Sequence, residues 1–403
     1  MTETSLTQTI QTTALVALYE SAKAPQECVA YHGALTPHRL DAPEAEIEAL
    51  VHGAGLQDLG WMRRVAVRGE DRFRWLSGMV TNSVNDLFPN TGAWNLVLNA
   101  QGRIQGDLTV WREGEELSPR RRNPVNPVAG KADPLTGTPF AGESGLELEI
   151  AADQFERLMA HLNHFIIMDD VELVPLGAGE QVGEAGSITA MGLTGPLANE
   201  ILERVGLPVA SQPMTGMSVE WNGLDLRILR GYGTLATHYE FWLPSAGLGK
   251  LWSCLRTGGA TPVGCESLEK MRIAEAIPAY GIDIVERDLP QETSQMRALH
   301  FNKGCYLGQE IVERIRSRGS VHRHLRPLEL TGPAPESGTE IFQEDGTPAG
   351  QITSAAELPL AAGRRVFALG VVRAEAEVRS QTFTYTSGTA KGSANILAEP
   401  PTF

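Results

Sequence analysis

One cysteine of the chain is framed by residues that could make it reactive. In "HFNKGCYLGQEIVERIRSRGS", Cys305 lies two residues after Lys303 and between Gly304 and Gly308. Glycines at these positions permit a tight turn with positive φ, and the residues after it predict a short helix ended by the next glycine. A nearby lysine charge and a helix N-terminus both stabilise a thiolate, which lowers the pKa of a thiol below its usual ~8.5. Residue chemistry alone leaves two interpretations open, a working thiol or a small cysteine buried at a packed turn.

The cysteines do not predict a metal centre. One cysteine cannot hold a zinc ion or an iron–sulfur cluster, since such sites usually take about four protein ligands. Cys254 and Cys265 are 11 residues apart and belong to other predicted elements. We therefore expect no metal site built by this chain alone. The four irregularly spaced cysteines are typical of reduced thiols in a cytoplasmic protein.

Basic residues follow the cysteine motif closely. Such a cluster could bind a carboxylate-rich tail or phosphates. The alternative is a solvated helix face and linker whose basic groups pair with nearby acids. The residues concerned are Arg314, Arg316, Arg318, His322, Arg323 and Arg326.

Composition limits the classes of function. The chain has 403 residues, of which 42% are hydrophobic and 21% charged, as in packed proteins of several domains. With 34 Lys and Arg against 49 Asp and Glu, the net charge is −15, which disfavours direct binding to nucleic acid. No apolar run of about 18 residues predicts a membrane span, and the start lacks the positive charge of a secretory signal. We expect a cytoplasmic protein without membrane contact.

Strands and helices alternate irregularly along most of the chain. Residues 1–50 predict one or two helices, and residues 64–68 a strand followed by an amphipathic helix. "AWNLVLNAQGRIQGDLTVWREG" predicts a β-hairpin. Residues 113–145 are rich in proline and glycine and predict a flexible loop with three exposed arginines. This order is typical of an α+β fold.

The predicted division of the chain has four parts. An α+β region covers residues 1–260, with a subdomain junction near 175–190. A helix and the cysteine motif occupy 261–322. Residues 323–385 contain short strands separated by turn residues, which predicts a small β-barrel. Residues 386–403 are predicted to be a flexible tail.

The motif "KGCYLGQE" resembles the signature of the YgfZ family. These are folate-binding proteins that are related to the glycine-cleavage T-protein and support iron–sulfur enzymes. "KMRIAEAIPAYGIDIVERDLPQE" is similar to the sequence that precedes this signature in the family. "VRGEDRFRWLSGMVTNSVNDL" and "LNAQGRIQGDLTVW" resemble its N-terminal part, and "GQITSAA" and "ALGVVR" its closing barrel. The resemblance runs from about Gly55 to Ala376, apart from the loop at 113–145.

The resemblance implies a T-protein-like α+β fold, with two interleaved α+β portions around a central folate cavity and a C-terminal β-barrel. It implies tetrahydrofolate or another reduced folate as ligand. Iron–sulfur client enzymes or assembly proteins would be the partners, with tRNA-modifying enzymes among the candidate clients. Cys305 would be the working thiol, tuned by Lys303. The supporting motif residues are Gly304, Tyr306, Gly308, Gln309 and Glu310.

Four further residues match or could serve a folate site. Glu240, in "THYEFWLP", occupies the place of the family's pterin-binding glutamate. A carboxylate can accept two parallel hydrogen bonds from the amino-pyrimidinone edge of a pterin. Arg272 matches the family arginine near the benzoyl-glutamate portion, and Tyr232 and Tyr239 could flank the pterin. On their own, these residues could equally be a strand acid, a helix-surface arginine and two core tyrosines.

Departures from the T-protein pattern favour an accessory protein over an enzyme. The T-protein carries its transferase aspartate just after the strand that this chain writes in "LELEIAADQFERL". Here only Asp153 lies near that register. In "RIAEA", Ala274 and Ala276 replace an acid and a glycine, which places Glu275 on a neighbouring helix face. A tetrahydrofolate-dependent aminomethyl- or methyltransferase is therefore the alternative. An RNA-associated module is a third hypothesis, which rests only on the basic clusters.

Overall fold

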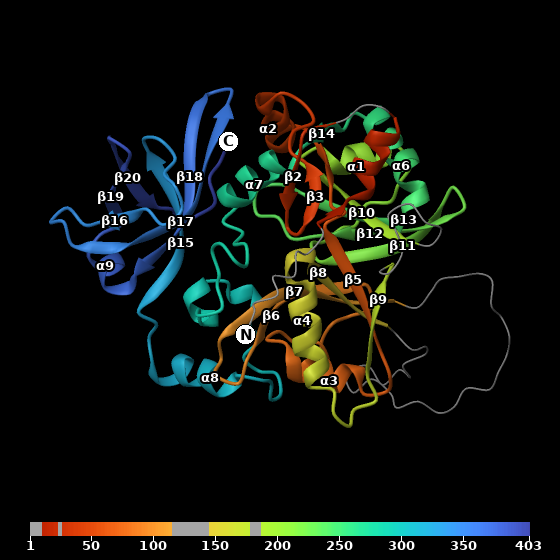
Figure 1. Cartoon of the computed structure of the whole chain (residues 1–403), viewed down its shortest axis with the longest axis horizontal. Helices are drawn as coiled ribbons and strands as arrows, with labels where there is room; N and C mark the ends of the chain where they lie inside the picture. Colours follow the sequence, from red (N-terminus) through yellow and green to blue (C-terminus); the bar gives the residue numbers. More distant parts are fainter. Residues whose placement is uncertain (1–9, 23–25, 115–144, 178–186) are drawn as a thin grey trace, which may run out of the picture.

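An α+β body lies beside a six-stranded β-barrel (Figure 1). The computed structural model describes residues 10–22, 26–114, 145–177 and 187–403. The predicted flexible loop at 113–145 lies almost entirely outside the described residues. The arrangement of body and barrel agrees with the predicted α+β fold class and its C-terminal β-barrel.

The N-terminal region contains a small sheet as well as the predicted helices. Its strands run in the order β1-β3-β2, with β1 parallel and β2 antiparallel to β3. The turn between β2 and β3 places His32 at φ 46° and Gly33 at φ 82°. The prediction of helices alone was wrong here, because strands this short leave little alternation to read. The elements are β1 (Gln11–Thr12), α1 (Ala14–Ser21), β2 (Cys28–Tyr31), β3 (Ala34–Pro37) and α2 (Pro43–His52).

An eleven-stranded mixed sheet forms the centre of the body, in the order β14-β4-β10-β13-β12-β11-β6-β7-β8-β5-β9. Strand β4 pairs with β10 and β14 from later in the chain, so the two portions are interleaved. They meet where Thr91 of β6 pairs with Thr215 of β11. The strands are β4 (Gly55–Asp58), β5 (Met62–Arg68), β6 (Thr91–Leu98), β7 (Ile104–Arg112), β8 (Leu146–Ala151), β9 (Glu172–Leu176), β10 (Ile188–Thr194), β11 (Thr215–Trp221), β12 (Leu224–Arg230), β13 (His238–Pro244) and β14 (Thr261–Val263).

Each portion of the sheet has its own helices and core. Helices α3 and α4 pack on the first portion through Leu76 and Leu158, which are fully buried. Helices α5 and α6 pack on the second through Leu202 and Leu251. The remaining helices are α3 (Arg72–Met79), α4 (Ala152–His164), α5 (Ala198–Arg204), α6 (Leu248–Thr257), α7 (Cys265–Ala274), α8 (Gln309–Arg318) and α9 (Ala374–Arg379), with 3-10 turns η1 (Ser245–Gly247), η2 (Pro290–Thr293) and η3 (Met296–Ala298).

The C-terminal barrel is closed in the order β15-β18-β17-β16-β19-β20. Its end differs from the predicted boundary, because the segment expected as a flexible tail from residue 386 supplies β20, which pairs with β15 and closes the barrel. Phe383, Tyr385 and Ala394 point inward and are buried. The polar residues that alternate with them face outward, and they made this segment resemble a flexible tail in the sequence. The strands are β15 (Arg323–Thr331), β16 (Glu340–Phe342), β17 (Pro348–Leu360), β18 (Gly363–Arg373), β19 (Thr382–Ser387) and β20 (Ala390–Ile396).

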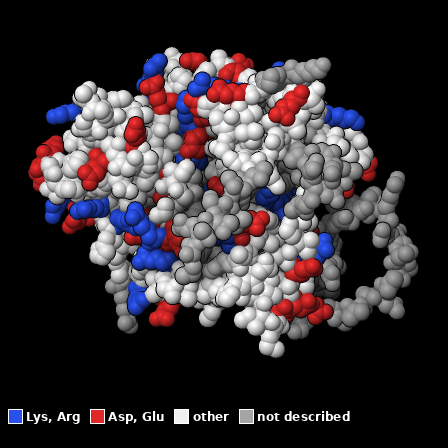
Figure 2. Space-filling view, viewed as in Figure 1, with Lys and Arg blue, Asp and Glu red and all other residues white. Residues whose placement is uncertain are grey.

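Charges of both signs are interspersed on the face seen in Figure 2. Three members of the predicted basic cluster are paired with acids, the first being Arg316, which binds Glu313 at 3.5 Å. Arg323 binds Asp288 at 2.7 Å and Glu292 at 3.1 Å, and Arg326 binds Glu377 at 2.7 Å. These pairs agree with the alternative of a linker neutralised by nearby acids. None of the helices in the described part of the chain is long and apolar enough to cross a bilayer.

Candidate active site

A cavity of about 280 Å³ lies between the two portions of the sheet, α7 and the turn after β2. Its walls are apolar and aromatic with a few polar groups, the usual character of a small-molecule site. Three of the predicted folate residues, Glu240, Arg272 and Tyr232, line it. Other lining residues are Tyr31, His32, Trp61, Trp94, Asp107, Trp111, Glu149, His238, Glu275 and Arg297.

Glu240 is a buried acid on β13, with 7% of its surface exposed. Trp242 Nε1 donates to its Oε2 at 3.1 Å, and His238 Nε2 lies 3.6 Å from its Oε1. Burial alone would raise its pKa, but hydrogen bonds from His238, Glu149 and Trp242 hold the pKa of Glu240 below its usual value. The cavity therefore presents an ionised carboxylate, which an edge of N–H donors can meet.

Glu149 on β8 is the second half of this acid pair. Burial, followed by the neighbouring charge of Glu240, raises the pKa of Glu149 well above its usual value. Trp111 Nε1 donates to its Oε2 at 3.2 Å. The pair thus retains one proton above the usual pKa of a carboxyl group, with protonated Glu149 donating to ionised Glu240, because two adjacent carboxylates cannot both ionise cheaply.

This shared proton predicts a stability change in Glu149→Gln. Above a pH of about 4.5 the folded state keeps a proton on Glu149 that the unfolded chain has lost, so the contribution of this group to the free energy of unfolding falls by up to about 1.4 kcal/mol per pH unit until the proton is released. Glutamine donates the same hydrogen bond without a proton. We expect Glu149→Gln to be about 1–3 kcal/mol more stable than wild type at pH 8, measured by urea unfolding from pH 5 to pH 8.

The matched control is Glu156→Gln, which changes an exposed glutamate on α4. It should keep the pH slope of the wild type. A Glu149→Gln protein that keeps that slope, or that is less stable than wild type at pH 8, would contradict the shared proton.

Asp107 is an acid of the cavity that the sequence analysis missed. Its carboxylate accepts hydrogen bonds from Trp94 Nε1 at 2.8 Å and Gln154 Nε2 at 2.9 Å. Burial raises its pKa, and a cavity carboxyl with a raised pKa is a candidate for proton transfer. The signal was present in β7, where Gln105, Asp107 and Thr109 alternate with buried residues, because aspartate is unfavourable inside a strand.

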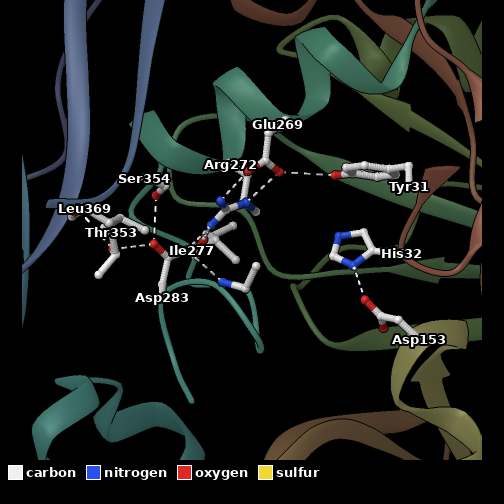
Figure 3. A network of polar contacts seen from close by, with 11 residues as sticks. Tyr31, His32, Asp153, Glu269, Arg272, Ile277, Asp283, Thr353, Ser354 and Leu369 are labelled. Carbon is white, nitrogen blue, oxygen red and sulfur yellow. Dashed lines mark hydrogen bonds and ion pairs between the residues drawn. The ribbon is translucent and has the colours of Figure 1, made fainter. Parts of the chain in front are cut away.

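Arg272 lines the cavity, but protein partners engage most of its donors (Figure 3). Its Nε and Nη2 form a two-fold contact with Glu269, and Nη1 donates to Asp283 Oδ2 and to the Ile277 carbonyl, both at 2.6 Å. Asp283 Oδ1 accepts from two barrel hydroxyls in turn. Four of its five N–H donors are engaged, and the guanidinium is therefore a structural link.

The two predicted tyrosines have different positions. Tyr232 lines the cavity and contacts Arg297, whose Cζ lies 3.7 Å from the ring centroid. Tyr239 is fully buried in the core behind the sheet, and its hydroxyl donates to Asn199 Oδ1 at 2.8 Å. The prediction that Tyr239 flanks the ligand does not agree with this position, because neighbouring strand residues face opposite sides. Glu240 therefore faces the cavity while Tyr239 faces the core.

Asp153 does not line the cavity, but it contacts His32, which does. Its Oδ2 is 3.3 Å from Nδ1 of His32, and the His32 ring packs against Trp61 with 4.5 Å between centroids. Figure 3 shows this pair apart from the Arg272 network. Glu275, whose role the sequence placed in doubt, does line the cavity and accepts from the backbone N–H groups of Leu235 and Ala236.

Cys305 lies on an exposed loop and is not among the residues that line the cavity. The loop is held on its C-terminal side by Gly308, at φ 81°, where a Cβ would lie 2.6 Å from the Asn99 carbonyl oxygen. Gln309 Oε1 accepts from the Tyr306 backbone N–H at 3.2 Å. Gly304 is exposed, with no atom close to the position that a Cβ would take, and Glu310 is exposed at the start of α8. The chain thus presents the thiol to solvent on an anchored turn.

Lys303 holds the same loop from its N-terminal side. Its ammonium group donates to the carbonyls of Ser77, Val80 and Asn82 at 2.7, 2.6 and 2.7 Å. Burial lowers its pKa to about 7, while the three carbonyls match the three donors of its charged form. The structure thus gives Lys303 an anchoring role that the prediction of a thiol-tuning lysine did not include.

Lys303→Met should therefore destabilise the fold, unlike a change at the thiol. Methionine fills the space but leaves three carbonyls without their donor, so the free energy of unfolding should fall by about 2–4 kcal/mol. Cys305→Ser should change it by less than about 0.5 kcal/mol, because the thiol is exposed. Urea unfolding of both variants tests this, and equal stabilities would show that Lys303 does not anchor the loop.

In the described residues, no group of three or more His, Cys, Asp or Glu side chains is placed to hold a metal ion. The acids of the cavity bind indole, amide and imidazole groups instead.

Comparison with known proteins connects this geometry to one group of relatives. Residues 13–117 match the family model described as the GCVT N-terminal domain. A putative chloroplastic transferase of Arabidopsis thaliana is 25% identical over 353 residues, covering 85% of this chain and 71% of the relative. The aminomethyltransferase of Pelodictyon phaeoclathratiforme is 24% identical over 353 residues, covering 85% of each chain.

The fold matches a solved structure over nearly its whole length. The aminomethyltransferase T of the glycine cleavage system from Bartonella henselae superposes with a TM-score of 0.76, covering 97% of this chain and 98% of that one, at 20% identity. This likeness shows that the fold is of the aminomethyltransferase type.

Proposed function

We propose that the cavity binds tetrahydrofolate or another reduced folate, and that the chain is an accessory protein that supports the assembly or repair of iron–sulfur enzymes. The cavity supports the ligand: ionised Glu240 offers a carboxylate to the donor edge of a pterin, between aromatic walls. The resemblance of the sequence to folate-binding proteins agrees with this assignment.

The observation that carries the accessory role is the anchored, exposed thiol. Lys303 and Gly308 fix the loop on either side, yet Cys305 itself remains open to solvent. A thiol held in this way can reach a partner protein, and it does not have to reach the cavity. Iron–sulfur client enzymes or assembly proteins are the partners that the resemblance implies, with tRNA-modifying enzymes among the candidate clients.

Asp107 favours a second candidate, a tetrahydrofolate-dependent aminomethyl- or methyltransferase. The acid faces the cavity, and burial raises its pKa. A group of this kind could move a proton to or from a bound folate. The names of the relatives, aminomethyltransferase and putative transferase, support this candidate at the level of the family.

Folate binding is tested by titration of the wild type and Glu240→Gln. Loss of a charged hydrogen-bond acceptor should weaken binding of 5-formyltetrahydrofolate by roughly 10- to 100-fold, as followed by calorimetry. Glu220→Gln, an exposed change on β11, is the matched control and should bind like the wild type. A wild-type protein that does not bind this folate would remove the proposal.

The two candidates differ in which residue they require. The accessory role predicts that Cys305→Ala binds folate normally but fails to restore iron–sulfur enzyme activity in cells that lack the protein, whereas Asp107→Asn restores it. The control Cys254→Ala, on α6, should restore activity too. The transferase role predicts turnover by the purified protein that falls about 100-fold or more in Asp107→Asn and is unchanged in Cys305→Ala.

A further inference from the structure

Arg297 lies where two cavities meet. It lines the central cavity together with Tyr232 and Glu275, and the same three residues line a second cavity of about 620 Å³ that extends toward the barrel and the C-terminal residues. Its guanidinium packs on aromatic rings of both Trp94, 4.4 Å from the centroid, and Tyr232, 3.7 Å from the centroid. A ligand longer than a pterin would pass this guanidinium.

Arg297 forms no ion pair with any residue in the described part of the chain. Its Nε donates to Gln295 Oε1 at 3.3 Å. The two acids that interact with its charge, Asp107 and Glu275, are bound by neutral donors from indole, amide and backbone groups instead. A largely desolvated guanidinium with unused donors favours an anion, because charge-assisted hydrogen bonds would replace the water it has lost.

The backbone that carries Arg297 is fixed before any ligand binds. Asn82 Nδ2 donates to the Arg297 carbonyl at 2.9 Å, and Thr81 Oγ1 donates to the next carbonyl, that of Ala298, at 2.6 Å. The aromatic contacts hold the side chain as well. A pre-organised cation loses little conformational entropy when it binds an anion.

Arg272 is the arginine that the sequence resemblance places near the benzoyl-glutamate portion. Unlike Arg297, it is already paired with two protein acids. Glu269, Asp283 and a carbonyl already engage four of its five N–H donors. A ligand carboxylate that approached it would meet two protein carboxylates that are already paired with the same guanidinium.

We infer that Arg297, and not Arg272, binds a carboxylate at the glutamate end of the reduced folate, with the glutamate directed toward the second cavity. This inference rests on the proposed folate site and names the residue that recognises the anionic end of its ligand. A planar guanidinium suits this task, since its two parallel N–H groups match the two oxygens of a carboxylate.

The test compares 5-formyltetrahydrofolate with the dimethyl ester of its glutamate end. The two probes share the pterin and the benzoyl ring and differ in carboxylate charge. We expect the wild type to bind the free acid roughly 10- to 100-fold more tightly than the ester, and Arg297→Met to reduce this preference to about threefold or less. Methionine keeps the packing between the two aromatic rings. Arg297→Lys keeps the charge and should retain part of the preference.

Arg316→Met is the matched control, because Arg316 also stacks on an aromatic ring, that of Phe301 at 4.4 Å, but lines neither cavity. It should keep the full wild-type preference. If Arg297→Met keeps that preference too, or if the wild type binds acid and ester equally, the role of Arg297 is wrong while folate binding stands. If the wild type binds neither probe, the proposed folate site fails and the role of Arg297 fails with it.

Discussion

The buried ion pair between Arg272 and Asp283 joins the parts of this molecule. Arg272 projects from α7, and the side chain of Asp283 is fully buried in the segment that leads from α7 toward the cysteine motif. The second oxygen of Asp283 accepts from Thr353 and Ser354 of the barrel strand β17. A buried carboxylate that lost its guanidinium would be strongly destabilising, by about 3–5 kcal/mol. The link therefore fixes the barrel, α7 and one wall of the cavity in a single arrangement.

This link also decides how charge is distributed in the cavity. Because Glu269 and Asp283 neutralise Arg272, this residue forms part of the cavity wall but does not offer an unpaired positive charge to a ligand. Glu240 shares its site with a protonated neighbour and stays ionised. Arg297, on the wall shared with the second cavity, has no ion pair with any residue that the structure describes. The cavity thus carries an anionic group and a cationic group on different elements, which suits a ligand with a donor-rich head and an anionic end.

The fold class could be predicted because motif, hairpin and barrel signals are local. The N-terminal sheet could not, since β2 and β3 have four residues each and are stabilised by packing against the body rather than by their own pattern. Glu240 was found by its position in a motif, whereas Asp107 required knowing which face of β7 lines the cavity. The position of Tyr239 follows from strand alternation once Glu240 is placed inward. The pairing state of Arg272 could not be inferred at all, because its partner Asp283 is positioned by tertiary contacts with the barrel.

The thiol and the cavity are separate sites that share their supports. The β6–β7 hairpin carries Asp107 into the cavity, and at its turn Gly102 packs so closely on α8 that a Cβ there would lie 2.8 Å from Ile311 Cβ. Asn82 provides a second shared support, since its carbonyl accepts from Lys303 of the thiol loop while its side chain binds the Arg297 carbonyl. The β6–β7 hairpin and Asn82 therefore contact both the cavity residues Asp107 and Arg297 and the elements that position Cys305. The sulfur of Cys305 itself is exposed and lies outside the residues that line the cavity.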